Sequence, residues 1–197
     1  FMRCLKFVRP GIAEYEIEAE IIHEYIRNRA SGHSFYPIIA SGASACVLHY
    51  IENNKVCQDG ELLLIDTGAE YANYAGDLSR TLPVNGRFTK RQKEVYNACL
   101  RVMKQARSLL VAGKHIDSYH KEVMKIMEAE LLGLGLISAK DIENQDPSNP
   151  AVKKYFPDGA SHFMGLDVHV EGHRFVRCEP GRLVSCEPGI YIREEGI

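Results

Sequence analysis

Two strand-like segments, residues 61–69 and 74–83, each contain an aspartate among apolar residues. Asp66 directly follows a run of four apolar residues, and aspartate is disfavoured both in strands and beside buried apolar sequence unless its charge is compensated. Asp77 lies in the second segment. A hairpin that turns at residues 71–72 would place the two aspartates opposite each other, where like charges are destabilising unless a cation lies between them. The spacing therefore favours a metal site in this hairpin.

A simpler interpretation of the two aspartates also stays open. Asp66 would open a turn with Thr67 and Gly68, and Asp77 would form an ion pair with Arg80. Neither carboxylate would then bind a metal. Other residues of the chain must decide between the two interpretations.

A third acid, Glu187, lies between two strand-like apolar segments, 183–186 and 190–192. Glu179 is the competing candidate, but Arg177 precedes it and a Pro-Gly-Arg sequence follows it, which is typical of a solvated turn. We therefore favour Glu187 as the third ligand.

A histidine near these acids widens the choice of metals. His162 lies between a proline-containing loop and an apolar segment, and His169 follows seven residues later. A lone histidine is more often an ordinary core or surface residue than a ligand. One imidazole with several carboxylates, however, suits manganese, cobalt, iron or zinc and does not suit an all-oxygen calcium site.

The wider pattern predicts helices that are segregated from strands. Apolar residues recur at helical spacing over 14–26, a capping box at Thr89 opens a helix to about residue 110, and Asp117 can cap another to about residue 132. The polar segment 141–158 contains three prolines and predicts a loop.

Strand-like runs fill most of the remaining sequence. They are residues 36–40, 46–51, 61–69 and 74–83, together with short apolar runs in the last forty residues. Together these helices and strands predict an α+β domain with an antiparallel sheet.

Composition excludes several classes of protein. The 197 residues carry 24 lysines and arginines against 26 aspartates and glutamates, a net charge of −2 that argues against a nucleic-acid partner. No run approaches the roughly 20 apolar residues needed to cross a membrane.

The six cysteines form no CxxC pair and predict reduced thiols in a cytoplasmic protein, although a disulfide between Cys178 and Cys186 stays open. The start at Phe1 indicates a piece of a longer protein.

Several ordered motifs, which span nearly the whole chain, resemble those of aminopeptidase P, the Xaa-Pro aminopeptidases of the pita-bread metallopeptidase family. The motifs are IDTGAEY at 65–71, GDLSRT at 76–81, SHFMGLDVH at 161–169 and CEPGIYI at 186–192, together with LHYIEN at 48–53 and FVRPG at 7–11.

This resemblance implies a pita-bread catalytic domain, in which two α+β halves related by pseudo-twofold symmetry hold two divalent metals over a curved antiparallel sheet flanked by helices. Manganese is the usual metal, and cobalt, zinc and iron are alternatives. The family's metal ligands map onto Asp66, Asp77, His162 and Glu187. By the same mapping, His49 and His169 line the substrate site and stabilise the scissile peptide, and Glu187 accepts a proton from the attacking water.

The implied reaction is hydrolysis of the N-terminal Xaa-Pro peptide bond through a metal-bridging hydroxide, with a peptide whose second residue is proline as substrate. The 25 residues from His162 to Glu187 resemble aminopeptidase P more than prolidase, whose interval is longer. Two alternatives remain: a prolidase acting on Xaa-Pro dipeptides, and a non-catalytic pita-bread binding module. A homo-oligomer is compatible with this interpretation.

The chain also departs from the family pattern. Asp158 stands where the family usually has a histidine, four residues before His162. The fifth family ligand, a glutamate, would lie beyond Ile197. We therefore expect residues 1–197 to be a pita-bread catalytic domain truncated at both ends, without its N-terminal domain and last ligand strand, and to be weak or inactive as an isolated chain.

Overall fold

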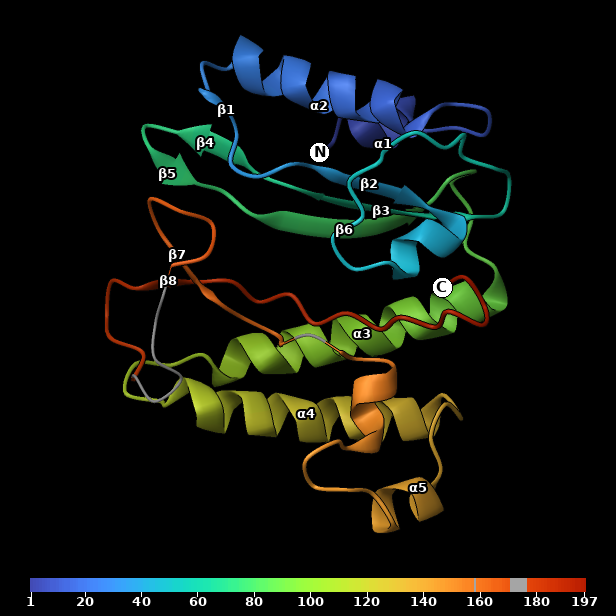
Figure 1. The fold of residues 1–197 in the computed structure, drawn as a ribbon, viewed down its shortest axis with the longest axis vertical. Helices are drawn as coiled ribbons and strands as arrows, with labels where there is room; N and C mark the ends of the chain where they lie inside the picture. Colours follow the sequence, from blue (N-terminus) through green and yellow to red (C-terminus); the bar gives the residue numbers. More distant parts are fainter. Residues whose placement is uncertain (158, 171–176) are drawn as a thin grey trace. The chain divides into compact units, whose positions relative to one another are not determined.

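The computed structural model describes residues 1–157, 159–170 and 177–197, so Asp158 lies outside the described residues. The chain divides into two compact units, which are described separately (Figure 1). The first unit contains Phe1–Lys90, Met164–Val168 and Tyr191–Ile197, and the second contains Arg91–Phe163 and His169–Ile190.

The first unit is built from two helices, a 3-10 turn and six short strands. They are α1 (Cys4–Phe7), α2 (Glu14–Arg27), β1 (Gly32–His33), β2 (Ile38–Ser41), η1 (Gly42–Cys46), β3 (Leu62–Thr67), β4 (Ala69–Tyr71), β5 (Tyr74–Ala75) and β6 (Leu78–Pro83). The strands form two antiparallel sheets, in the orders β2-β3-β6 and β1-β4-β5. Helix α2 lies along one face of the β2-β3-β6 sheet (Figure 1).

The β2-β3-β6 sheet has two different faces because successive side chains of a strand point to opposite sides. On the face toward α2, Ile17 and Ile21 belong to one buried cluster with Ile39, Leu63 and Ile65. The partly buried Leu64 packs against a second cluster, which consists of the buried residues Ile38, Ala40, Ala45 and Tyr50. Even-numbered residues of β3, including Asp66, therefore face away from α2.

The predicted hairpin is present, but it turns one residue later than expected. Tyr71 pairs with Tyr74, and the two loop residues Ala72 and Asn73 have φ values of 51° and 69°. Two consecutive positive φ values are typical of the tight turns that match strand twist. This one-residue shift changes the partner of Asp66, as described below.

The second unit is mainly helical. Its elements are α3 (Lys90–Leu109, whose first residue belongs to the first unit), α4 (Ile116–Gly133), α5 (Ala139–Glu143), η2 (Ala151–Lys154), β7 (Phe163–Met164, whose second residue belongs to the first unit) and β8 (Leu183–Val184). Arg101 of α3 forms a two-pronged ion pair with Glu130 of α4 at 2.6 and 2.8 Å, and Arg91 donates to the Leu134 carbonyl. The start of α3 therefore meets the end of α4, and the two helices are antiparallel (Figure 1).

Several sequence predictions of secondary structure are confirmed and three need correction. Helices predicted over 14–26 and 89–110 appear as α2 and α3. The predicted strand 46–51 is wrong, because the chain forms a 3-10 turn up to Cys46 and residues 47–51 form no strand. The predicted loop 141–158 contains the end of α5 and all of η2. Helix α4 begins at Ile116 with His115 at the N-cap, so Asp117 lies inside the helix and does not cap it.

All six cysteines are free in the structure, which agrees with the prediction of reduced thiols and leaves no disulfide between Cys178 and Cys186. Among the described residues, no helix combines the length and apolar character that a membrane span requires.

Candidate metal site

Asp66 and Asp77 lie near each other in the first unit, but not in the predicted register. Asp66 pairs with Ser79 across β3 and β6. Asp77 is two residues before Ser79, so it is a diagonal neighbour of Asp66 on the same face of the hairpin. Diagonal neighbours are about 7–8 Å apart, with Cβ atoms somewhat closer, against about 4.5–5.5 Å between the Cβ atoms of opposed residues. The prediction of a shared face is confirmed, and the prediction of direct opposition is wrong.

The surroundings of the two aspartates fit a cation. The Oδ1 atom of each is buried and accepts no hydrogen bond from the described residues. Oxygen atoms that carry negative charge are costly to bury without a compensating positive charge. Asp77 also borders a cavity of about 340 Å³ in the first unit, next to Gly76 and Thr67.

His162 and Glu187 come together in the second unit, although 25 residues separate them in the sequence. His162 Nε2 lies 2.9 Å from Glu187 Oε1, and both side chains are about one-quarter exposed. Backbone hydrogen bonds fix this approach: Ser185 N donates to the His162 carbonyl and Glu187 N donates to the Ala160 carbonyl, both at 2.9 Å. The structure therefore confirms that the predicted imidazole and carboxylate converge.

The second ring nitrogen of His162 constrains what can lie between these two groups. Nδ1 is 3.2 Å from the carbonyl oxygen of Phe163. A proton on Nδ1 that is donated to this carbonyl leaves Nε2 as an acceptor facing the Glu187 carboxylate. Two acceptors such as Nε2 and Glu187 Oε1 repel each other at 2.9 Å unless a proton or a metal cation binds to both. Nitrogen and carboxylate oxygen are the donor atoms that manganese, iron and zinc accept.

The two proposed substrate-site histidines lie in different units. In the second unit, His169 is exposed and its ring centroid is 4.3 Å from that of His162. In the first unit, His49 is exposed, has φ of 54°, and precedes Tyr50, a member of the cluster on the Asp66 face of the sheet.

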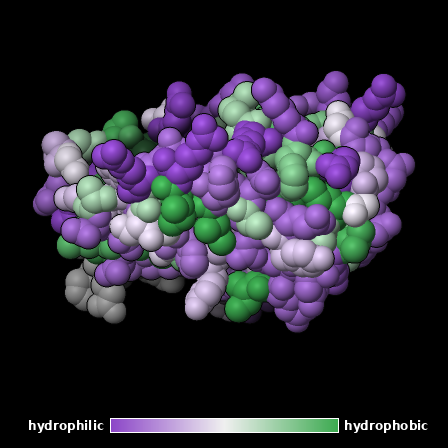
Figure 2. All heavy atoms as spheres, turned by 90° about the horizontal axis from the view of Figure 1, so that it is seen from above, coloured by the Kyte–Doolittle hydropathy of each residue, from purple (hydrophilic) through white to green (hydrophobic). Residues whose placement is uncertain are grey.

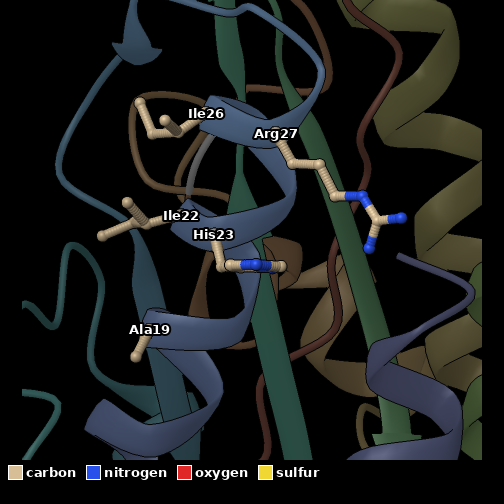
Figure 3. Close-up of a pocket in the computed structure, with 5 residues that line it drawn as sticks. All are labelled: Ala19, Ile22, His23, Ile26 and Arg27. Carbon is tan, nitrogen blue, oxygen red and sulfur yellow. The ribbon is translucent and has the colours of Figure 1, made fainter.

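A shallow surface pocket on α2 is a poorer candidate for a metal site. Figure 3 shows the residues that line it: Ala19, Ile22, His23, Ile26 and Arg27. It contains one imidazole, one guanidinium and no carboxylate, so it lacks the donor set of a divalent metal. Figure 2, seen from the α2 side, shows small apolar patches interrupted by polar side chains.

Sequence patterns missed two buried polar residues whose hydrogen-bond partners are distant in the sequence. Glu14 is fully buried at the start of α2, and Tyr119 is fully buried on α4. A glutamate at a helix start ordinarily indicates a solvated position, and a tyrosine at an apolar helical position ordinarily indicates core. No signal in the local sequence could have identified either of them as a hydrogen-bonding support.

The chain belongs to metallopeptidase family M24, whose family model matches residues 1–197. This family uses divalent metal ions, in agreement with the donor atoms described above.

Curated relatives include two bacterial Xaa-Pro aminopeptidases. The protein of Haemophilus influenzae is 41% identical over 171 residues, which cover 87% of this chain and 39% of the relative. The protein of Escherichia coli K12 is 41% identical over 194 residues, which cover 96% of this chain and 44% of the relative. The chain thus spans less than half the length of these relatives.

Solved structures of E. coli aminopeptidase P also match this chain. Zinc-substituted E. coli aminopeptidase P in complex with product matches with a TM-score of 0.91 at 39% identity, over 99% of this chain and 47% of that one. The same enzyme with the inhibitor Pro-Leu matches with a TM-score of 0.89 at 40% identity, over 96% of this chain and 44% of that one. These matches confirm the predicted α+β pita-bread fold.

Proposed function

We propose that the protein containing this chain is a metal-dependent aminopeptidase that hydrolyses the N-terminal Xaa-Pro bond of peptides. The relatives that carry this name support the proposal, and so does the convergence of His162 and Glu187 at 2.9 Å. A cytoplasmic location and a homo-oligomer stay predictions.

We further propose that two divalent metals, with manganese as the expected ion, are bound by Asp66, Asp77, His162 and Glu187. The burial of Oδ1 of Asp66 and Asp77 supports their role, because carboxylate oxygens are donor atoms that a divalent metal prefers. Bound at these four residues, two such metals would supply the Lewis-acid chemistry that lowers the pKa of water toward neutral pH.

The residues of the chain would perform the remaining tasks. Glu187 accepts the proton of the attacking water, since a carboxylate beside the reacting centre can act as a general base. His169, which is exposed and packed against the His162 ring, donates a hydrogen bond to the substrate. His49 is also exposed and serves the same purpose. Proline fits such a reaction because its nitrogen carries no hydrogen and its ring restricts the preceding peptide.

Metal binding tests the ligand assignment directly. Manganese affinity of the chain would be measured by titration calorimetry for the unmodified chain and for Glu187→Gln, with Glu179→Gln as the matched control. Glu179 is the competing acid, is exposed and pairs with Arg182 at 3.3 Å. We expect Glu187→Gln to weaken binding at least tenfold and Glu179→Gln to leave it unchanged. Equal affinities in all three would refute the assignment of Glu187.

Peptide hydrolysis tests the activity. We expect the full-length gene product, loaded with manganese, to release the first residue from Xaa-Pro peptides and to leave Xaa-Ala peptides intact. Preference for Xaa-Pro dipeptides over longer peptides would favour the prolidase alternative. Stoichiometric metal binding without hydrolysis of either substrate would contradict the aminopeptidase proposal and favour the binding module.

A further inference from the structure

The hydroxyl of Tyr119, a residue of α4, contacts both chain segments that carry His162 and Glu187. Its side chain is completely buried. A 2.9 Å hydrogen bond joins its hydroxyl to that of Ser161, the residue before His162. The same hydroxyl lies 3.8 Å from the sulfur of Cys186, the residue before Glu187. One hydroxyl thus contacts both segments at equivalent positions.

The two segments are also joined to each other. The hydroxyl of Ser185 accepts a hydrogen bond from His162 N at 2.9 Å, in addition to the two backbone bonds described above. Cys186 in turn lies 3.8 Å from the carbonyl oxygen of Met103 in α3. The His162–Glu187 pair is therefore carried by a small hydrogen-bonded assembly whose fixed points are the helices α3 and α4.

The Tyr119 hydroxyl is suited to this position because it stays neutral. Burial raises the pKa of Tyr119 far above its ordinary value. A neutral hydroxyl can donate one hydrogen bond and accept another, so it can interact with both Ser161 and Cys186.

We propose that Tyr119 is a positioning residue for the His162–Glu187 ligand pair and that its hydroxyl sets the spacing on which metal affinity depends. This inference rests on the proposed function, because it takes His162 and Glu187 as ligands. Residues behind metal ligands hold them in orientation, and their loss commonly lowers metal affinity 10- to 100-fold. Tyr119 acts on the neighbours of both ligands and touches neither ligand itself.

The test removes one oxygen atom and leaves the ring in place. Manganese affinity would be measured by titration calorimetry for Tyr119→Phe, with Tyr155→Phe as the matched control. Tyr155 is also a buried tyrosine of the second unit, and its hydroxyl lies 2.7 Å from Lys154 Nζ. We expect a 10- to 100-fold weaker affinity for Tyr119→Phe and less than a twofold change for Tyr155→Phe.

A spectroscopic readout separates positioning from general loosening of the fold. With cobalt in place of manganese, the visible absorption reports the geometry around the metal. We expect Tyr119→Phe to change this spectrum at saturating cobalt while the far-ultraviolet circular dichroism stays that of the unmodified chain. Ser161→Ala removes the same hydrogen bond and should copy both effects. Ser161→Ala should add little to Tyr119→Phe in the double variant, because the Tyr119–Ser161 hydrogen bond is already lost in Tyr119→Phe.

The controls distinguish failure of this inference from failure of the proposed function. If Tyr119→Phe and Ser161→Ala keep the original affinity and cobalt spectrum while His162→Ala and Glu187→Gln weaken binding, the role of Tyr119 is refuted and the metal site stands. If none of the four variants affects metal binding, the ligand assignment itself is wrong. Should Tyr119→Phe fail to fold, Ser161→Ala decides the question alone.

Discussion

Glu14 offers a sharp test of how a buried charge supports the first unit. Its carboxylate is fully buried and accepts four hydrogen bonds. Oε1 accepts from the backbone N and the hydroxyl of Ser41, both at 2.7 Å. Oε2 accepts from the Tyr50 hydroxyl at 2.8 Å and from Lys55 N at 3.0 Å. This one side chain therefore joins the start of α2 to the end of β2 and to the segment that follows His49.

Replacing Glu14 by glutamine keeps the size of the side chain but replaces one acceptor by an amide donor. In either orientation of the amide, one backbone N–H, of Ser41 or of Lys55, faces that donor and loses its acceptor. A buried donor left unsatisfied costs about 1–3 kcal/mol, and the remaining bonds lose the strength that the charge gave them. Relief of the cost of burying the charge offsets part of this loss. We expect Glu14→Gln to lower the free energy of unfolding by about 3 kcal/mol.

Urea unfolding followed by circular dichroism measures this change. The chain has two units, so the transition that is assigned to the first unit is the relevant one. Glu52→Gln is the control, because it makes the same chemical change on an exposed side chain, and we expect a change below about 0.5 kcal/mol. A loss below about 1 kcal/mol for Glu14→Gln, with an unchanged dependence on urea, would refute the importance of this network.

Three further predictions concern a thiol, a capping acid and a glycine. Burial raises the pKa of Cys57 to about 11, so at pH 8 a thiol reagent should modify Cys57 much more slowly in the folded chain than in urea, and equal rates would contradict this. Hydrogen bonds from the Ser138 side chain and backbone lower the pKa of Asp141. The support that Asp141 gives to α5 should therefore be present above its ordinary pKa and be lost as the pH falls through the lowered value, which NMR titration of the α5 amides detects; Asp141→Asn should abolish this dependence. A Cβ at Gly68 would collide with the carbonyl oxygen of Gly76, so Gly68→Ala should lower stability by at least about 1–3 kcal/mol in urea unfolding, while a neutral substitution would show that the hairpin can open there.

Local patterns predicted much of the fold because their causes are local. The helix over 14–26 and the hairpin over 61–83 follow from the spacing of apolar residues along a few turns or strands. The turn was misplaced by one residue because no glycine marks it. Ala72 and Asn73 both adopt positive φ values, and alanine gives no signal for this conformation.

The candidate site was predicted less completely, because it depends on contacts between residues distant in the sequence. Periodicity identified Asp66 and Glu187 as acids in apolar surroundings, but it could not bring Glu187 to His162; the family resemblance supplied that pairing. The burial of Glu14 and Tyr119 and their hydrogen bonds were not predicted. Their hydrogen-bond partners lie 27 to 67 residues away, so their burial is decided by tertiary structure.

The diagonal register of the two aspartates changes what metal removal should do. Opposed carboxylates would repel strongly enough to strain the hairpin, whereas diagonal neighbours, about 7–8 Å apart, repel less and still share a face. The metal-free chain should therefore fold, but with a small repulsion that Asp77→Asn relieves. We expect Asp77→Asn to raise the stability of the metal-free chain by up to about 1 kcal/mol.

The same substitution should abolish most of the stabilisation that manganese gives. A ligand at 100 times its dissociation constant stabilises the folded chain by about 2.7 kcal/mol, and a chelator should remove this gain from the unmodified chain alone. Thermal unfolding with manganese and with chelator measures both effects, and Asp59→Asn, a change at an exposed aspartate, serves as the control. If Asp77→Asn raises stability without metal and lowers it with manganese, Asp77 serves metal binding at a cost to the stability of the metal-free chain. A loss of stability in both conditions would instead show that Asp77 supports the hairpin itself.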